Sequence, residues 1–244
     1  MHPKADKIGR SMGTLHRFEL SRYREHYDLA TLFETGTLRG DGAQAALDAG
    51  FEKIFSVEMI EEFFAASSER FAEQENVVIL QNSSVAALDG MLPDIDTGIF
   101  FWLDAHFPGA DGGLRDYNAE ADESIRCPLE SELEVIKRHR GDRKDVILID
   151  DLRMYETGPF ENGEMAERIR RPSGNGIDFV YRLFGDTHHI VKLYFDEGYV
   201  LLLPIDSTPK IYVRRVIRDV DGEIGRLLAQ QKSNAAVDPK DPKD

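Results

Sequence analysis

The sequence LATLFETGTLRGDG, residues 29–42, decides the fold class of this chain. It begins as an apolar run of strand length and then turns through Gly36, Gly40 and Gly42 into a segment of helical period. Glycine adopts positive φ without strain and lets a ligand approach the backbone closely. The predicted helix would point its free N–H groups and the positive end of its dipole at the turn. Such a strand–turn–helix unit binds carboxylates as readily as phosphates.

Apolar runs of strand length alternate with longer segments of helical period along the rest of the chain. The predicted strands are residues 29–33, 53–57, 77–81, 98–103 and 146–149, and the predicted helices are residues 41–49, 61–74 and 129–139. Near the carboxyl end, residues 189–195 and 199–204 flank a short Gly-containing connection typical of a β-hairpin. This order predicts an α/β domain with helices on both faces of a mostly parallel seven-stranded sheet that ends in an antiparallel hairpin.

Three segments lie outside this alternation. We expect residues 1–28 to form a helical cap before the main domain, which we place at residues 29–231. Residues 108–126 are rich in glycine and acidic residues, and we expect a surface excursion there whose glycines could hinge a lid. An ordinary solvated loop is the alternative. Residues 232–244 repeat Asp-Pro-Lys and are expected to be disordered.

Length and charge limit the class of protein. With 244 residues, 41% of them hydrophobic, the chain can bury one sizeable core, so we expect one domain. The formal net charge of -15 repels phosphate and argues against a nucleic-acid partner, and the basic runs at 137–140 and 168–171 are interpreted as solvated helix faces. No apolar run can span a bilayer, and the single cysteine, Cys127, fits a reducing compartment. We therefore expect a cytoplasmic protein without a membrane partner, and self-association into a homo-oligomer is left open.

The glycine spacing separates two classes of nucleotide-binding loop. A nicotinamide fingerprint requires Gly-x-Gly-x-x-Gly, and Gly36-Thr37-Leu38 breaks that pattern at the second glycine. The carboxylate of Glu34, at the end of the first predicted strand, would repel a pyrophosphate but could bind an ammonium group. A nicotinamide or nucleotide enzyme of the doubly wound class is therefore the alternative interpretation.

The run Glu34-Thr35-Gly36-Thr37-x-x-Gly40 resembles the first motif of the class I S-adenosylmethionine-dependent methyltransferases, an acidic residue followed by a Gly-rich turn. The resemblance implies a Rossmann-like three-layer fold and a cofactor loop formed by these five residues. It also implies that Gly36 lies against the methionine moiety and that Glu34 orients its amino group, directly or through water. The terminal hairpin fits the same family, because simple doubly wound dinucleotide folds need none.

Residues after the second and third predicted strands are further candidates for the cofactor. Glu58 lies about twenty residues after the loop, where an acidic side chain can accept hydrogen bonds from ribose hydroxyls. The alternative for Glu58 is a carboxylate at a helix N-terminus. Ser83 and Ser84 follow the third strand, where the family places polar contacts to adenine, although Ser84 is equally suited to be the N-cap of the next helix.

Carboxylates and a histidine follow the fourth and fifth predicted strands. Because ligands bind outside the carboxyl ends of parallel strands, Asp104, His106, Asp150 and Asp151 should converge on one cleft. Three carboxylates repel one another unless protons or a cation compensate them. Hard oxygen ligands favour magnesium, calcium or manganese over zinc, so Asp104, Asp150 and Asp151 are candidate metal ligands. A helix cap is the alternative, but it explains only one of two adjacent aspartates.

These residues resemble the macrocin O-methyltransferase group and related sugar and natural-product O-methyltransferases, which carry an aspartate after the fourth strand and Ile-Asp-Asp at the fifth. In that group the carboxylates hold a divalent metal that binds two substrate hydroxyls. This chain departs from the group, because it reads Leu-Asp-Ala-His rather than Asp-Gly-Asp at the fourth strand. His106 and Asp104 are the catalytic candidates, with His106 as general base, and Asp104 is also a candidate for cofactor binding. The alternative for His106 is a structural role, in which its ring is hydrogen-bonded within a strand-to-loop turn.

Together these features predict an S-adenosylmethionine-dependent O-methyltransferase for a small-molecule hydroxyl on a sugar, polyol or natural product, with Mg²⁺ as a candidate second cofactor. The rival from another class is a regulator that binds the cofactor and has lost the chemistry. The acceptor stays unidentified at this stage, because acceptor pockets are built from loops whose shape the sequence does not give.

Overall fold

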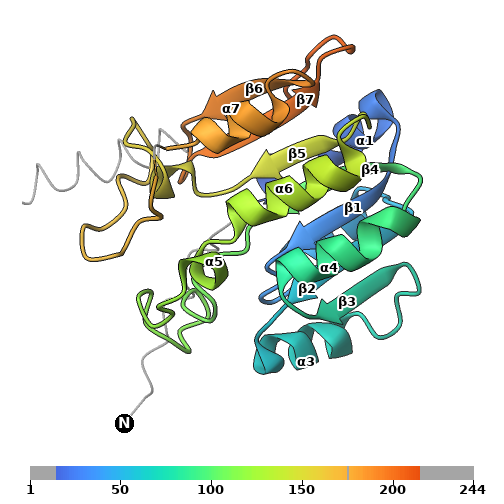
Figure 1. The fold of residues 1–244 in the computed structure, drawn as a ribbon. Helices are drawn as coiled ribbons and strands as arrows, with labels where there is room; N and C mark the ends of the chain where they lie inside the picture. Colours follow the sequence, from blue (N-terminus) through green and yellow to red (C-terminus); the bar gives the residue numbers. More distant parts are fainter. Residues whose placement is uncertain (1–14, 175, 215–244) are drawn as a thin grey trace, which may run out of the picture. The chain divides into compact units, whose positions relative to one another are not determined.

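Seven strands form one sheet in the order β3-β2-β1-β4-β5-β7-β6 in the computed structural model, which describes residues 15–174 and 176–214 (Figure 1). The bounds are Leu29–Thr35 for β1, Lys53–Glu58 for β2, Val77–Gln81 for β3, Gly98–Leu103 for β4, Val146–Ile149 for β5, His188–Leu193 for β6 and Tyr199–Pro204 for β7. The first five strands pair in parallel, whereas β7 pairs antiparallel with both β5 and β6. The predicted mostly parallel sheet with a terminal antiparallel hairpin is confirmed.

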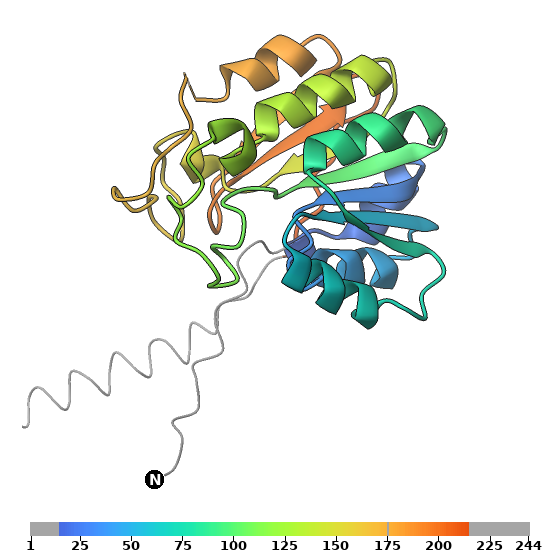
Figure 2. The same ribbon diagram turned by 60° about the horizontal axis from the view of Figure 1, so that its bottom comes forward.

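Helices cover both faces of the sheet, as the alternating pattern predicted (Figures 1 and 2). On one face α4, α6 and α7 lie side by side, and on the other face α1, α2 and α3 pack against the first strands. The bounds are Leu20–Tyr27 for α1, Asp41–Asp48 for α2, Glu61–Arg70 for α3, Ser84–Met91 for α4, Leu129–Arg140 for α6 and Asp178–Phe184 for α7. A short helix, α5 (Glu123–Arg126), and three 3-10 turns (Leu15–Arg17, Leu92–Asp94 and Leu152–Met154) complete the described elements.

By its contacts the chain divides into residues 1–212 and residues 213–244, and the seven strands and the described helices all belong to the first unit. The predicted end of the domain at residue 231 and the predicted tail at 232–244 lie outside the described residues. The described part of the predicted cap contains α1, which packs on β1 and β4. Among the described residues, no helix combines the length and the apolar character needed to cross a membrane.

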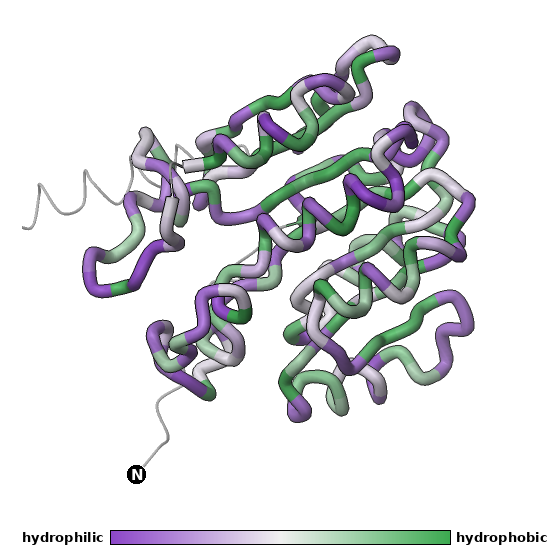
Figure 3. Tube along the Cα trace, in the orientation of Figure 1, coloured by the Kyte–Doolittle hydropathy of each residue, from purple (hydrophilic) through white to green (hydrophobic). Residues whose placement is uncertain are grey.

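The core is organised by the register of the central strands. Phe55, Phe33, Phe101, Ile147 and Leu202 stand next to one another across five strands, and all five side chains are buried. Together with apolar side chains of α4, α6 and α7 they form one continuous cluster. Figure 3 shows the same division, with hydrophobic strands at the centre and hydrophilic loops around them. Because these buried side chains hold the strands in this order and register, they also determine which loops meet at the carboxyl ends of the strands.

A buried ion pair lies at the amino-terminal ends of β4 and β5, opposite the carboxyl ends of the strands. Arg140, the last residue of α6, donates to both carboxylate oxygens of Asp145 at 2.5 and 2.8 Å and to the carbonyls of Ile95 and Thr97. The N–H of Ile99 donates to the same carboxylate at 2.8 Å. The interpretation of this basic run as a solvated helix face is therefore wrong for Arg140, whose side chain is buried against the starts of β4 and β5.

Candidate active site

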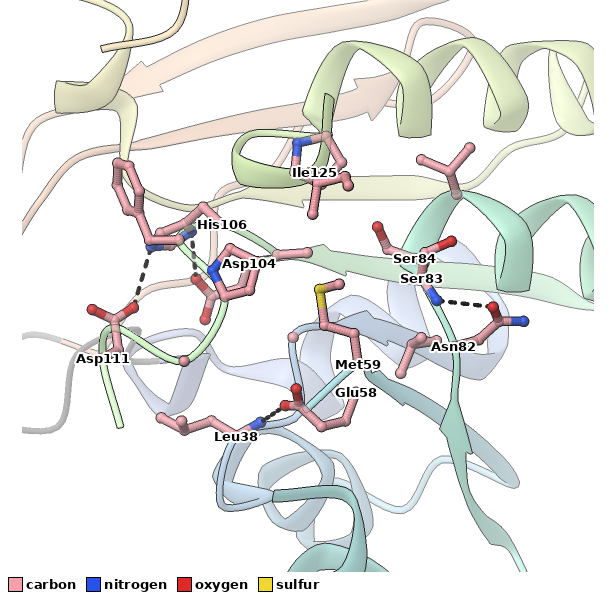
Figure 4. A pocket seen from close by; sticks show the side chains of 18 of the residues that line it. Leu38, Glu58, Met59, Asn82, Ser83, Ser84, Asp104, His106, Asp111 and Ile125 are labelled. Atoms are coloured by element: carbon pink, nitrogen blue, oxygen red, sulfur yellow. Dashed lines mark hydrogen bonds and ion pairs between the residues drawn. The ribbon is translucent and has the colours of Figure 1, made fainter. Parts of the chain in front are cut away.

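A cavity of about 490 Å³ lies at the carboxyl ends of the parallel strands (Figure 4). Each of the loops after β1 to β5 contributes to its wall, and the strand order reverses between β1 and β4, where open α/β sheets bind ligands. The volume is in the range of small-molecule sites. Of the predicted residues, Gly36, Glu58, Ser83, Ser84, Asp104, His106, Asp150 and Asp151 line the cavity, whereas Glu34, Thr35, Thr37 and Gly40 do not.

The Gly-rich loop is pressed against the end of β4. Gly36 has φ 87°, and a Cβ at this position would lie 2.8 Å from the carbonyl oxygen of Asp104, so only glycine fits. Leu38 in the same loop, Phe107 and Asp151 also have positive φ (47°, 41° and 53°), and all three line the cavity. Each such non-glycine residue costs about 1–3 kcal/mol, and strain of this kind concentrates at functional sites.

Glu34 lies behind the loop and not in the cavity. Strand β1 continues two residues beyond the predicted end, which places Glu34 in register with Ser56, under the first turn of α2. Its carboxyl accepts from the Ser56 hydroxyl, which in turn lies 2.6 Å from Thr37 Oγ1, and a Cβ on Gly42 would overlap Oε1. Burial raises the pKa of Glu34 to about 8, and hydrogen bonds from Ser56 and the Ala43 N–H offset part of that rise. In this arrangement Glu34 holds the loop against α2.

Glu58 joins the Gly-rich loop to the end of β2. Its Oε2 accepts from the N–H of Leu38 and its Oε1 from the N–H of Ile60, both at 2.8 Å. Burial raises the pKa of Glu58, and these backbone donors oppose the rise. Glu58 therefore accepts a backbone hydrogen bond at the start of α3, as its alternative interpretation predicted. Its carboxylate also lines the cavity. The N–H of Met59 also acts on this carboxylate, and the lone-pair capacity that remains can accept a hydrogen bond from a ligand.

The loop after β3 supplies the cap of α4 and part of the wall. Ser83, not Ser84, is the N-cap, because its hydroxyl accepts from the N–H of Ala86 at 3.3 Å and the helix begins one residue later. Asn82 Oδ1 accepts from the N–H of Ser83 at 2.9 Å. Asn82, Ser83 and Ser84 all line the cavity, so this wall of the cavity carries polar groups.

Two apolar side chains that the sequence analysis did not single out, Met59 and Ile125, line the same half of the cavity. They are 41% and 40% exposed, and Figure 4 shows them on opposite sides of the cavity, with Met59 beside Glu58. Exposed apolar side chains inside a cavity provide surfaces for a flat ring. Met59 could have been found from its position directly after Glu58, but Ile125 belongs to the short helix α5, which has no clear periodic signal.

The other half of the cavity is acidic and centred on His106. His106 Nε2 lies 2.9 Å from Asp151 Oδ2 and 3.5 Å from Asp111 Oδ2, and Nδ1 lies 3.6 Å from Asp104 Oδ1. Burial disfavours the charged imidazolium, but the hydrogen bond that the ring donates to Asp151 and the nearby carboxylates of Asp151, Asp104 and Asp111 outweigh it and raise the pKa of His106 well above its ordinary value. The surrounding carboxylates therefore favour the protonated ring in this arrangement. Arg153 Nε adds a second cation, 3.1 Å from Asp151.

Asp104 and Asp150 are the less compensated carboxyls of this group. Burial raises the pKa of both well above the ordinary value, and each has another carboxylate nearby that adds to the rise. Asp151 occupies the N-cap position of a 3-10 turn but caps nothing with its side chain, so capping does not explain the aspartate pair. Although the three predicted metal ligands line one cavity, no group of three or more His, Cys, Asp or Glu side chains among the described residues is arranged to hold a metal ion.

A buried carboxyl that the sequence analysis missed, Glu132 of α6, lies beneath both halves of the site. It is 1% exposed, and its Oε1 has no hydrogen-bond partner among the described residues. Burial raises the pKa of Glu132 to about 7, and hydrogen bonds with Ser84 and Thr35 offset part of the rise. Glu132 also lines a second cavity of about 10 Å³ with Asp150 and His106, enough for about one water molecule.

The excursion at 108–126 forms one side of the cavity. A Cβ on Gly112 would overlap the ring of Phe63, so the excursion reaches α3 across the site. Asn118 fastens it to a later loop, since its side-chain amide donates to the carbonyl of Arg168 at 2.8 Å. The excursion is therefore packed on both flanks, and its role as a lid stays a prediction.

Comparisons with known proteins agree with this fold. No family model matches the chain, and no curated protein matches its sequence. A structure from Staphylococcus aureus assigned as a caffeoyl-CoA O-methyltransferase is 10% identical and matches with a TM-score of 0.55, over 76% of this chain and 80% of that chain. The methyltransferase PaMTH1 of Podospora anserina, with bound S-adenosylhomocysteine, is 15% identical, with a TM-score of 0.52 over 77% and 76%. At these identities the comparisons establish that the chain has the Rossmann-like fold of these proteins.

Proposed function

We propose that this chain is an S-adenosylmethionine-dependent O-methyltransferase that acts on a small-molecule hydroxyl. The observation that carries the proposal is one cavity that joins a Gly-rich loop and Glu58 at one end to His106 and four aspartates at the other. The shared fold adds support, since one of the proteins with this fold described above, PaMTH1, holds S-adenosylhomocysteine. Membership of the macrocin-like group stays a prediction that rests on Asp104, Asp150 and Asp151.

The residues of the first half suit this cofactor. Gly36 has no side chain where a methionine moiety would pass, and the Glu58 carboxylate lines the cavity and has lone-pair capacity left for a ribose hydroxyl. Met59 and Ile125 provide two apolar walls for adenine, and Ser83 provides a polar edge. Glu34 acts indirectly in this proposal, because it supports the loop from behind.

The residues of the second half suit activation of an acceptor hydroxyl. When bound, S-adenosylmethionine supplies a methyl group on a sulfonium, a leaving group that needs no protonation. The chain then has to align the acceptor, exclude water and remove one proton. His106, oriented by Asp151, is the group placed for that proton. A cationic ligand beside His106 lowers its pKa by repulsion, so the imidazole can release its own proton and accept that of the hydroxyl.

The proposed mechanism does not use a metal ion. The described carboxylates do not form a three-ligand group, and Asp151 is already paired with His106 and Arg153. Metal assistance is tested by measuring turnover in EDTA and in excess Mg²⁺. Equal rates are expected, and a loss of activity in EDTA that Mg²⁺ restores would assign the aspartates to a metal.

Calorimetry with S-adenosylhomocysteine and NAD tests the cofactor, and transfer of a labelled methyl group to a panel of hydroxyl acceptors tests the reaction. We expect binding of S-adenosylhomocysteine and not of NAD. Glu58→Gln should weaken this binding about tenfold, the worth of about one charge-assisted hydrogen bond. Glu62→Gln, which changes an exposed carboxylate in the first turn of the following helix α3, is the matched control. No binding at millimolar concentration overturns the proposal, and binding without turnover of any acceptor favours a regulator.

A further inference from the structure

Two carboxyl oxygens in the interior lack a hydrogen-bond partner within the part of the chain that the structure describes. They are Oε1 of Glu132, in α6, and Oδ1 of Asp150, the residue after β5. Glu132 is 1% exposed and Asp150 is 5% exposed. A buried carboxyl oxygen without a donor is costly, because it has given up its hydrogen bonds to bulk water, and native proteins satisfy nearly all such atoms. Each of these two oxygens therefore needs a donor that the surrounding side chains do not supply.

Both side chains line the second cavity of the molecule. Its volume of about 10 Å³ suits about one water molecule and is too small for an organic ligand. Of the described residues on its wall, His106 and Tyr155 are also polar and the rest are apolar. A water molecule has two hydrogens to donate, so a single molecule can serve both carboxyl oxygens and still accept a hydrogen bond. The second cavity therefore has the size and the polar groups of a water site.

The other contacts of Glu132 connect it to the walls of the large cavity. Its carboxyl accepts from the hydroxyls of Ser84 and Thr35. Ser84 lines the cofactor half of the site. Thr35 ends β1, and its carbonyl oxygen accepts from the N–H of Asp104 at 3.1 Å. Glu132 therefore bonds directly to groups beside the cofactor half and the end of β4, whereas the second cavity lies between it and Asp150.

We propose that one water molecule binds in the second cavity, donates to Glu132 Oε1 and to Asp150 Oδ1, and makes Glu132 a positioning residue for the acceptor half of the site. The positioning role rests on the function proposed above, whereas the water site does not. The N–H of Asp151 already bonds to the Asp150 carboxyl, so the water completes the hold on a side chain that lines both cavities together with His106. Because Glu132 lies outside the wall of the large cavity, it should affect turnover and not cofactor binding.

Crystal structures that resolve ordered water test the water site in the full chain and in two variants. In the wild-type chain we expect density for one water molecule at hydrogen-bond distance, about 2.5–3.0 Å, from both carboxyl oxygens. Glu132→Gln should keep this water, because the amide can bond to it and to the two hydroxyls. Glu132→Met should lose the water, because methionine has a similar length but only a weakly accepting thioether in place of the carboxyl.

Turnover of the same variants tests the positioning role. In Glu132→Met, kcat should fall about tenfold, the worth of about one hydrogen bond, while the affinity for S-adenosylhomocysteine in calorimetry stays within about threefold of wild type. Glu132→Gln should keep kcat within about threefold of wild type, because it keeps the water. Glu134→Met is the matched control, since it makes the same change at an exposed position of α6 and should alter neither quantity. A purely structural role of Glu132 would lower stability and cofactor affinity and leave the kcat of the folded, saturated enzyme unchanged.

Different results overturn the two parts of the proposal. Well-resolved wild-type density without a water between the two side chains, or with their oxygens in direct contact, overturns the water site. An unchanged kcat in Glu132→Met overturns the positioning role, and so does a loss in Glu132→Gln as large as that in Glu132→Met, because Glu132 would then act through its charge. A wild-type chain that neither binds S-adenosylhomocysteine nor turns over any acceptor overturns the proposed function and the positioning role with it, and leaves the water site to be decided by the density.

Discussion

The Glu132→Gln variant should be more stable than the wild-type chain at high pH and lose most of this advantage at low pH. Burial raises the pKa of Glu132 from 4.5 to about 7, and Ser84 and Thr35 offset part of the rise. A carboxyl whose pKa is higher in the folded state stabilises the fold below its unfolded pKa. That contribution is lost as the pH rises through the folded pKa, so the wild-type chain should lose stability between pH 4.5 and pH 7.

The size of the effect follows from the shift. Ionising Glu132 in the folded state costs about 3 kcal/mol for a rise from 4.5 to about 7, since one pKa unit is about 1.4 kcal/mol. Glutamine keeps the shape and cannot ionise. The free energy of unfolding of the variant, relative to wild type, should therefore increase by about 2–3 kcal/mol between pH 5 and pH 9. Other buried carboxyls, such as Glu34, titrate in both proteins and cancel in this difference.

Urea denaturation of both proteins at pH 5 and pH 9 measures this difference. Glu130→Gln is the control, because Glu130 lies in the same helical turn but is exposed and pairs with Arg182. The control should change stability by less than about 1 kcal/mol, and equally at both pH values. A Glu132→Gln effect of the same size at pH 5 and pH 9 would refute the reasoning.

Three further predictions concern other parts of the molecule. Gly36→Ala should weaken binding of S-adenosylhomocysteine at least about tenfold by displacing the loop, whereas Gly113→Ala, which also has positive φ but nothing within 4 Å, should leave that affinity unchanged in calorimetry. Arg140→Met should lower the free energy of unfolding by about 3–5 kcal/mol by leaving Asp145 unpaired, and a loss below about 1 kcal/mol in urea denaturation would contradict this. His106→Asn should reduce turnover about 100-fold or more with unchanged cofactor affinity, and near-normal turnover would remove His106 as the base.

Much of the fold could be predicted because buried parallel strands have continuous apolar sequences. Residues 77–81, 98–103 and 146–149 are strands with the predicted bounds. The prediction ended β1 two residues too early, because Glu34 and Thr35 are polar. They pair as strand residues because Ser56 and the start of α2 accommodate them. Because β1 is longer than predicted, Glu34 lies behind the loop and not in the cavity.

The candidate site was predictable where residues follow strand ends and not where they come from helix faces or loops. Glu130, Glu132 and Glu134 look alike in the sequence, yet only Glu132 is buried, because it lies between Leu129 and Ile136 on the apolar face of α6. That spacing could have identified it. The side chains of the 108–126 excursion had no comparable signal, since their positions depend on loop contacts.

A crystal structure of the chain with S-adenosylhomocysteine tests the central claim most directly. We predict electron density for the ligand in the 490 Å³ cavity, with the ribose hydroxyls at Glu58, adenine between Met59 and Ile125, and the sulfur toward Asp104 and His106. Density for the ligand elsewhere on the protein, or in the cavity with its ribose away from Glu58, would contradict the account.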